Sequence, residues 1–147
     1  SAVIGAASIN VLLIESDVLV RSTVASVCRE LEIVRIHQVT SLAMGEKWLK
    51  TWKADGLMMS LSEPEAAVEL LTRLRAGEFT SEARIPVAVM SAACNAAILS
   101  SLKDLKVGRF LLQPFKLRDV SRTVEQLWPL ALDKGLSKAN EPDNNKA

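Results

Sequence analysis

The chain has 147 residues, of which 49% are hydrophobic and 24% are charged, and its formal net charge is +1. This length and apolar content predict one folded domain with a buried core and exclude disorder of the chain as a whole. A net charge near zero, without a basic block, argues against direct binding of nucleic acid. No run approaches the ~20 apolar residues that cross a bilayer, so no membrane association is expected.

The two ends of the chain differ in composition from its middle. Residues 1–8 are apolar but few, and no positive region precedes them, so we interpret them as an N-terminal tail or tag remnant. Residues 133–147 are polar and include Asn-Glu-Pro-Asp-Asn-Asn, which predicts a disordered tail or linker. The folded domain is therefore expected over residues 9–132.

Short apolar runs alternate along this domain with segments of helical periodicity. The runs have strand length and end at polar breaks: Ile9–Ile14, Ile33–Val39, Leu57–Ser60, Ile85–Met90 and Gly108–Leu112. The helical segments carry apolar residues three and four apart: Val20–Leu31, Ser41–Trp52, Glu65–Ala76, Asn95–Leu105 and Leu117–Leu132. The chain thus has five predicted strands and five predicted helices.

Local signals predict where some helices begin and end. Ser16 or Asp17 can cap the first helix. Ser62 and Glu65 have the spacing of a capping box for the third helix, with Pro64 in its first turn. Gly77 is predicted to end that helix.

Strict alternation of strands and helices predicts an α/β fold with a parallel sheet covered on both faces. We expect a flavodoxin-like, doubly wound (βα)5 domain with strand order 2-1-3-4-5. In such a sheet the carboxyl ends of four strands converge. This edge would bring together the segment Glu15–Asp17, Ser60, Ser91 and the pair Gln113–Pro114.

These strand ends resemble those of response-regulator receiver domains of the CheY-like family. The acidic cluster at Glu15–Asp17, with Arg21 early in the next helix, is similar to the metal-binding start of a receiver. Ser60, with Pro64 four residues later, is similar to the phospho-acceptor strand and its loop. The resemblance extends over roughly residues 9–132.

The last two strands continue the resemblance. Ser91 followed by Ala92 resembles the switch hydroxyl and the small residue after it. Phe110 resembles the switch aromatic, and Gln113-Pro114-Phe115 resembles the lysine-proline-aromatic signature. Two interpretations of Ser91 and Phe110 stay open. They can form a coupled two-position switch like that of the family, or Phe110 can be fixed in the core, in which case there is no switch.

The sequence departs from the receiver pattern at three positions. Ser60 stands at the position of the family's acceptor aspartate, and Gln113 stands at the position of its lysine. Ser16 replaces one of the two acidic residues that the family has after the first strand. A serine hydroxyl would form a stable ester and needs a general base, whereas an aspartate forms an acyl phosphate. Glu15 and Asp17 either hold a weak Mg²⁺ or only solvate a strand end and cap a helix; we expect no metal.

Another aspartate, Asp55, precedes Ser60 by five residues. At ~3.3 Å per residue it would lie about 16 Å away along the strand, with its side chain on the opposite face. We therefore place Asp55 at the amino end of the strand and reject it as a substitute acceptor.

Two groups of residues are candidates for a protein interface. Trp48 and Trp52 lie four residues apart on one helical face, where they either anchor a partner or pack in the core. Charged residues decorate the fourth helix, fifth strand and fifth helix, through which a homodimer could form: Lys103, Arg109, Arg118, Asp119 and Arg122. Such mixed charges also occur on ordinary solvated surfaces.

Residues that would carry catalysis are sparse. There is no glycine-rich phosphate loop, nucleophile–histidine pair or metal-ligand cluster, so we expect neither an enzyme nor a cofactor. Cys28 and Cys94, both in segments predicted to be helical, are expected to be buried free thiols, as in a reducing cytoplasmic compartment. His37, the only histidine, is interpreted as an ordinary strand residue.

The sequence thus predicts a pseudo-receiver that acts through protein–protein interaction without aspartyl phosphorylation. Its partner would be another signalling protein or an attached output domain. Two alternatives stay open: a phosphorylation-competent regulator with a non-standard acceptor, and the regulatory domain of a longer transcription regulator. An enzyme on a flavodoxin-like scaffold is disfavoured.

Overall fold

The computed structural model describes residues 9–93 and 95–129. Ten elements follow one another in chain order: β1 (Asn10–Ile14), α2 (Val18–Leu31), β2 (Arg35–Val39), α3 (Leu42–Thr51), β3 (Gly56–Ser60), α4 (Pro64–Arg75), β4 (Val87–Ser91), α5 (Ala96–Asp104), β5 (Arg109–Leu112) and α6 (Leu117–Leu127). The predictions for residues 1–8, Cys94 and residues 133–147 lie outside the described residues.

The strands form one parallel sheet in the order β2-β1-β3-β4-β5, which confirms the predicted fold and strand order. Consecutive residues of a strand point to opposite faces, so each strand divides its apolar side chains between two layers. The central strands β3 and β4 are buried on both faces and nearly uniformly apolar, as is typical of parallel sheets.

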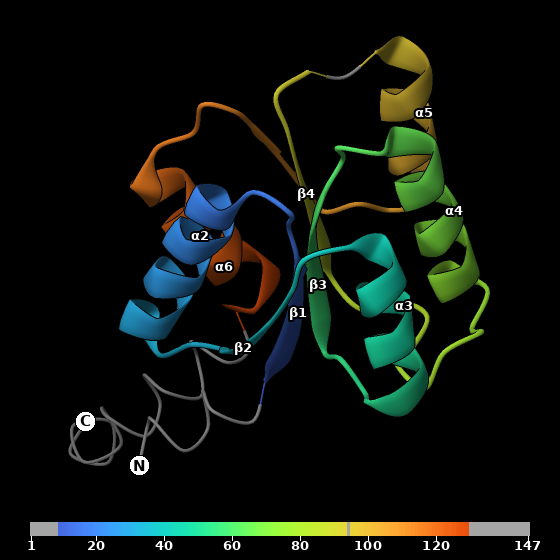
Figure 1. Cartoon of the computed structure of the whole chain (residues 1–147), viewed down its shortest axis with the longest axis horizontal. Helices are drawn as coiled ribbons and strands as arrows, with labels where there is room; N and C mark the ends of the chain where they lie inside the picture. The colour runs from blue at the N-terminus through green and yellow to red at the C-terminus, as the bar shows by residue number, and fades with distance from the viewer. Residues whose placement is uncertain (1–8, 94, 130–147) are drawn as a thin grey trace, which may run out of the picture.

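Helices cover both faces of the sheet. Helices α2 and α6 lie on one face, and α3, α4 and α5 lie on the other (Figure 1). The buried hydrophobic cluster on the α2–α6 face contains Leu13 and Met58 from the strands and Val24 and Val124 from the helices. The buried hydrophobic cluster on the α3–α5 face contains Leu12 and Met59 from the strands, with helix residues that include Leu49, Leu71 and Leu102. No helix within the described ranges is long and apolar enough to cross a membrane.

Helix ends agree with the sequence signals at two places and differ at two. The Asp17 carboxylate caps α2 by accepting a hydrogen bond from Val20 N at 2.9 Å. Gly77 follows the last residue of α4 with φ of +80°, a conformation that favours glycine. Helix α6 ends at Leu127, earlier than predicted, and residues 130–132 lie outside the described part.

The predicted capping box at α4 is wrong. Glu63 occupies the N-cap position without a side-chain hydrogen bond, and Pro64 is the first helical residue. The proline, whose missing N–H would be unpaired in the first turn anyway, therefore sets the start of the helix. Ser62 instead donates its backbone N–H to Ser60 Oγ at 3.1 Å.

Two glycines allow close packing against the sheet. A Cβ on Gly56 would lie 2.1 Å from Cζ2 of Trp128, whose indole covers the start of β3. A Cβ on Gly45 would lie 2.3 Å from Cδ1 of Ile14, so α3 approaches β1 more closely than a larger residue would permit. Glycine is required at both positions by space rather than by its dihedral angles.

Hydrogen bonds tie separate elements together at the amino edge of the sheet. Asp55 Oδ2 accepts from Asn10 N at 2.8 Å, which places this aspartate at the amino end of β3, as predicted. Ser81 Oγ accepts from Ala54 N at 2.8 Å and is buried. The Arg75 guanidinium donates to four backbone carbonyl oxygens, those of Ala83, Ile85, Leu105 and Lys106, at 2.7 to 3.3 Å.

Candidate functional site

The carboxyl edge of the sheet brings the predicted site residues onto neighbouring strand ends. In the register, Ile14 pairs with Met59 and Ser60 pairs with Met90, so Glu15 comes level with Ser60. Ser91 pairs with Leu112, and Gln113 N donates to the Ser91 carbonyl at 2.7 Å. By strand alternation, Glu15, Ser60 and Gln113 belong to the α2–α6 face, whereas Ser91 belongs to the other face.

Both strand-end hydroxyls bond to the loop that follows them. Ser60 Oγ, half-buried, accepts from Ser62 N at 3.1 Å. Ser91 Oγ donates to the Ala93 carbonyl and accepts from Ala93 N at 3.2 Å. Serine commonly makes such local bonds, which stabilise a turn. Within the described ranges, no hydrogen bond links these two hydroxyls to each other or to Glu15.

Glu15 is the one acidic residue buried at this edge among the described residues, with an exposed fraction of 3%. Its Oε2 accepts from Asp17 N at 3.0 Å, and its Oε1 is buried without a hydrogen-bond partner. Burial raises the pKa of this carboxyl, the neighbouring Asp17 charge adds to the rise, and backbone N–H groups oppose it. Arg21 donates to the Glu15 carbonyl at 2.8 Å rather than to its carboxylate.

The donor set at this edge does not fit Mg²⁺. Magnesium needs several hard oxygen ligands in an octahedral arrangement. The Asp17 carboxylate caps α2, and Ser16 and Ser60 offer only neutral hydroxyls. No group of three or more His, Cys, Asp or Glu side chains between residues 9 and 129, residue 94 aside, could hold a metal ion. No step that depends on Mg²⁺ is derived for this chain.

The two switch positions lie on the same face of the sheet. Ser91 is buried at the end of β4. Phe110, on β5, pairs with Val89 and packs half-buried against the cluster on the α3–α5 face. The ring is therefore neither enclosed in the core nor turned out into solvent.

An apolar surface borders the same edge. A cavity of about 390 Å³ lies between the start of α2 and the β5–α6 connection, and its lining includes Leu19, Ala92, Gln113 and Phe115. Of the lining residues, Leu19 is 76% exposed and Pro114 is exposed, and within two residues of the lining in the sequence Val18 and Leu117 are exposed as well. We call Val18, Leu19, Pro114, Phe115 and Leu117 the carboxyl-edge apolar surface.

Sequence reasoning missed this surface. The signal was present: Val18 and Leu19 are apolar, yet they fall outside the apolar stripe that packs α2 on the sheet. An apolar residue outside the buried stripe of a helix marks a surface that can contact a partner.

The structure places the candidate interface residues at opposite borders of the sheet. Trp48 and Trp52 lie on or just after α3, next to the edge strand β2, where Trp48 is half-buried and Trp52 is exposed. The charged residues lie on β5 and its flanking helices: Lys103, Arg109, Arg118, Asp119 and Arg122. Asp119 also accepts from Lys116 N at 2.8 Å and so helps to cap α6.

The order of the elements and the geometry of the sheet define the flavodoxin-like fold of CheY-like receiver domains. The signal receiver domain of a two-component histidine kinase from Clostridium thermocellum is similar, with a TM-score of 0.72, 19% sequence identity, and coverage of 81% of this chain and 96% of that chain. A response regulator from Thermotoga maritima is also similar, with a TM-score of 0.70, 19% identity, and coverage of 82% and 98%.

A longer protein shares the same fold over part of its length. RcsB from Salmonella enterica serovar Typhimurium, solved bound to a promoter, has a TM-score of 0.67 and 18% identity, and the match covers 81% of this chain and 67% of that one. No family model and no curated protein matches the sequence. At these identities the similarity demonstrates the fold, and function has to be argued from the carboxyl edge itself.

Proposed function

We propose that this chain is a pseudo-receiver, a cytoplasmic module that acts by binding another signalling protein and not by catalysis or aspartyl phosphorylation. The observation that carries the proposal is the residue at the end of β3. In the register of the sheet, Ser60 at the end of β3 lies level with Glu15. The resemblance to receiver domains implies an acceptor aspartate at this position. A serine there, hydrogen-bonded to its own loop, cannot form an acyl phosphate.

The surroundings of Ser60 supply no activation of its hydroxyl. His37, the only histidine in the sequence, lies on β2 and bonds to Asn10 at the amino end of β1. The Glu15 carboxylate accepts from Asp17 N instead of contacting Ser60. Gln113 replaces the cation that would balance phosphoryl charge. Among the residues that the structure describes, none is hydrogen-bonded to the Ser60 hydroxyl as a general base, and Gln113 offers no charge to stabilise a phosphoryl group.

The carboxyl-edge apolar surface supports binding of a protein partner. Exposed apolar side chains clustered beside a cavity are more typical of interaction sites than of solvated surfaces. A partner that buries Leu19 and Leu117 would gain roughly 25 cal/mol per Å² of apolar area removed from water. The free Cys28 in the core is consistent with a reducing compartment.

A test of the proposal uses the known chemistry of receivers as the probe. The protein is incubated with Mg²⁺ and acetyl phosphate, or with beryllofluoride, and its amide NMR spectrum is recorded. We expect no change at Ser60 and Ser91. Saturable shifts at these two residues, or a labile phosphorylated species, would overturn the proposal and favour the alternative of a phosphorylation-competent regulator.

A double variant provides the matched control. Ser60→Asp with Gln113→Lys restores the acceptor and the cation while leaving Ser16 unchanged. We expect this variant to gain some acceptance of phosphate under the conditions in which the wild type shows none. If it gains none, Ser16 is the remaining defect.

The partner surface has its own test. Leu19→Ser should weaken binding of an identified signalling partner, whereas Leu99→Ser, at a similarly exposed leucine on α5, should not. Equal effects of the two changes on partner binding would show that the interface lies elsewhere on the protein. One such place is the border formed by α5, β5 and α6, where a homodimer is the predicted alternative and Arg109→Glu would disrupt it.

A second candidate is the regulatory domain of a longer transcription regulator. The favouring observation is that this chain matches two thirds of the length of RcsB, which was solved bound to a promoter. The sequence of the full-length gene product decides this directly, because an output domain would follow residue 147.

A further inference from the structure

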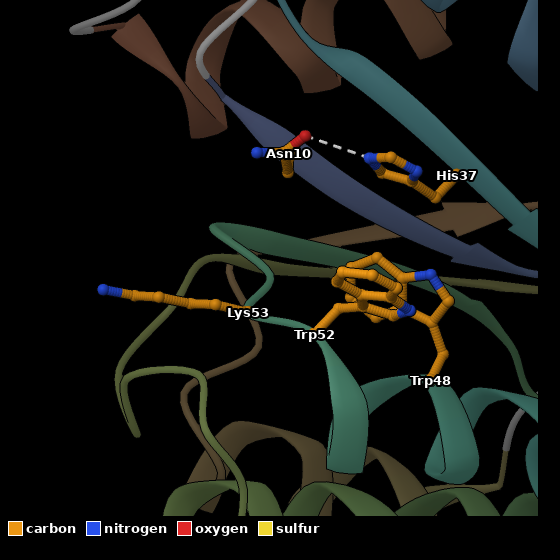
Figure 2. A pocket seen from close by; sticks show the side chains of 5 residues that line it. All are labelled: Asn10, His37, Trp48, Trp52 and Lys53. Atoms are coloured by element: carbon orange, nitrogen blue, oxygen red, sulfur yellow. Dashed lines mark hydrogen bonds between the residues drawn. The ribbon is translucent and has the colours of Figure 1, made fainter.

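A second hollow lies at the opposite end of β1 from the carboxyl edge. It has a volume of about 400 Å³ and is lined by Asn10, His37, Trp48, Trp52 and Lys53. Figure 2 shows the two indoles projecting from the end of α3 toward the side chains of β1 and β2. The volume is within the range of pockets that bind small molecules.

The floor of this hollow is aromatic. The His37 and Trp48 rings lie 5.2 Å apart between centroids and are tilted by 41°. Trp52, by contrast, is 60% exposed, which leaves much of its indole open to solvent. An indole open to solvent beside two packed rings offers a planar ligand a surface to stack on.

The polar groups of the hollow are mainly hydrogen-bond donors. Asn10 Oδ1 lies 2.9 Å from His37 Nε2, so with this amide orientation Nε2 carries the proton and donates to the amide oxygen. The Asn10 Nδ2 group points away from His37 in Figure 2 and has no hydrogen-bond partner among residues 9–93 and 95–129. Lys53 adds a positive charge at the border of the hollow, and its side chain extends away from the two indoles in Figure 2.

The charges around the hollow favour an anion. No acidic side chain from residues 9–93 or 95–129 lines it. Asp55, the acidic residue closest to Lys53 in sequence, accepts a hydrogen bond from Asn10 N. Burial and the nearby Arg35 lower the pKa of His37, so the positive charge among the described lining residues is that of Lys53.

Neighbouring hydrogen bonds hold the hollow in shape. Trp52 N donates to the Trp48 carbonyl at 2.8 Å, which closes the last turn of α3. Thr80 Oγ1 lies 3.0 Å from the Leu49 carbonyl and 3.3 Å from the Trp52 carbonyl, and donates to this end of the helix from another loop. A site held in this way loses little conformational freedom when a ligand binds.

We propose that this hollow binds a small planar aromatic carboxylate, which stacks on the Trp52 indole and meets the Asn10 amide and the Lys53 ammonium with its charged group. The site is separate from the carboxyl edge, and the inference does not depend on the pseudo-receiver function. It also accounts for the exposure of a tryptophan beside a formed cavity.

The three tryptophans of the chain provide a test with an internal control. Trp48 and Trp52 line the hollow, whereas Trp128 packs on the other face of the sheet. During titration of ¹⁵N-labelled protein with 2-naphthoate, we expect saturable shifts of the Trp48 and Trp52 indole N–H signals and none for Trp128. Equal shifts of all three signals, or no saturable shift, would overturn the proposal.

Ligand and protein variants separate stacking from charge. Trp52→Ala should weaken 2-naphthoate binding roughly tenfold, because it removes the aromatic ring on which the ligand stacks. Lys53→Gln should weaken it several-fold, whereas Lys47→Gln, on the exposed face of α3, should not. Unchanged binding to Trp52→Ala, or equally tight binding of the neutral 2-naphthamide, would contradict the site as proposed.

Discussion

The two edges of the sheet are built from different kinds of polar contact. At the amino edge, hydrogen bonds join elements far apart in the sequence: Asn10 to Asp55, Ala54 to Ser81, and Arg75 to the loops before β4 and β5. At the carboxyl edge, Ser60 and Ser91 bond to residues two positions away. The side-chain contacts at the amino edge therefore tie distant elements together, whereas at the carboxyl edge the strand ends are joined by backbone hydrogen bonds, such as that from Gln113 N to the Ser91 carbonyl, and the Ser60 and Ser91 hydroxyls contribute little.

The difference explains why side chains at the carboxyl edge can be exchanged without loss of the fold. A contact between distant elements is lost only at a cost in global stability, because a buried donor or acceptor is left unpaired. A contact within one loop can be exchanged for another at little cost. Four changes test this division, from the largest expected effect to the smallest.

Gly56→Ala should have the largest effect. Its Cβ would lie 2.1 Å from Trp128 Cζ2, so the indole or the start of β3 has to move. We expect a loss of about 3 kcal/mol in the free energy of unfolding, measured by urea denaturation. In a Trp128→Ala background the same change should cost much less, and equal costs in both backgrounds would contradict the clash.

Arg75→Met should cost about 2 kcal/mol, because it removes a donor from four backbone carbonyls while keeping most of the apolar stem. Arg84→Met, at an exposed arginine close by, is the control and should change the free energy of unfolding by less than ~0.5 kcal/mol. Similar losses for the two variants would show that the carbonyl contacts of Arg75 do not stabilise the amino edge.

A pair of serines compares the two edges directly. Ser81→Ala leaves the Ala54 N–H without its partner in a buried place and should cost about 1 kcal/mol. Ser60→Ala removes a loop contact near solvent and should cost less than ~0.5 kcal/mol. Denaturation of both variants under one set of conditions gives the comparison, and the reverse order would refute the division between the edges.

Glu15→Gln should have the smallest effect, and the effect should depend on pH. The pKa of Glu15 in the folded protein is raised above its usual 4.5, so ionisation of this carboxyl destabilises the fold. That cost is absent below pH ~4.5 and appears as the pH rises through the folded pKa. The variant should thus be more stable than the wild type at pH 7, by no more than ~0.5 kcal/mol, with a smaller difference at pH 4. A difference independent of pH would contradict this.

Much of the fold could be predicted because its signals are periodic. Unbroken apolar runs such as Leu57–Ser60 and helical stripes such as that of Val20–Leu31 depend on which side chains face the core, and a single sequence displays that pattern. The strand order was predicted as that of the flavodoxin-like doubly wound fold, which the alternation of strands and helices favours. The capping box at Ser62 failed because Pro64 fixes the first turn, and proline outweighs a side-chain cap.

The candidate site could be predicted only as a set of positions. The strand ends were expected to converge because parallel strands share one edge, but the partner of each hydroxyl depends on loop geometry that no periodicity encodes. The unpartnered Glu15 Oε1 and the exposed Leu19 depend on three-dimensional packing for the same reason. For Trp48 and Trp52 the sequence left core and interface open, and the structure places one half-buried and the other exposed.

The sheet separates two apolar layers that share a backbone but no side-chain contact. Val124 belongs to one layer and Leu71 to the other, and successive residues of each strand alternate between the two layers. Changes in stability from substitutions in different layers should simply add, whereas those within a layer should not. Each half of the interior can thus change in sequence independently of the other, which allows the fold to persist at a sequence identity of 19%.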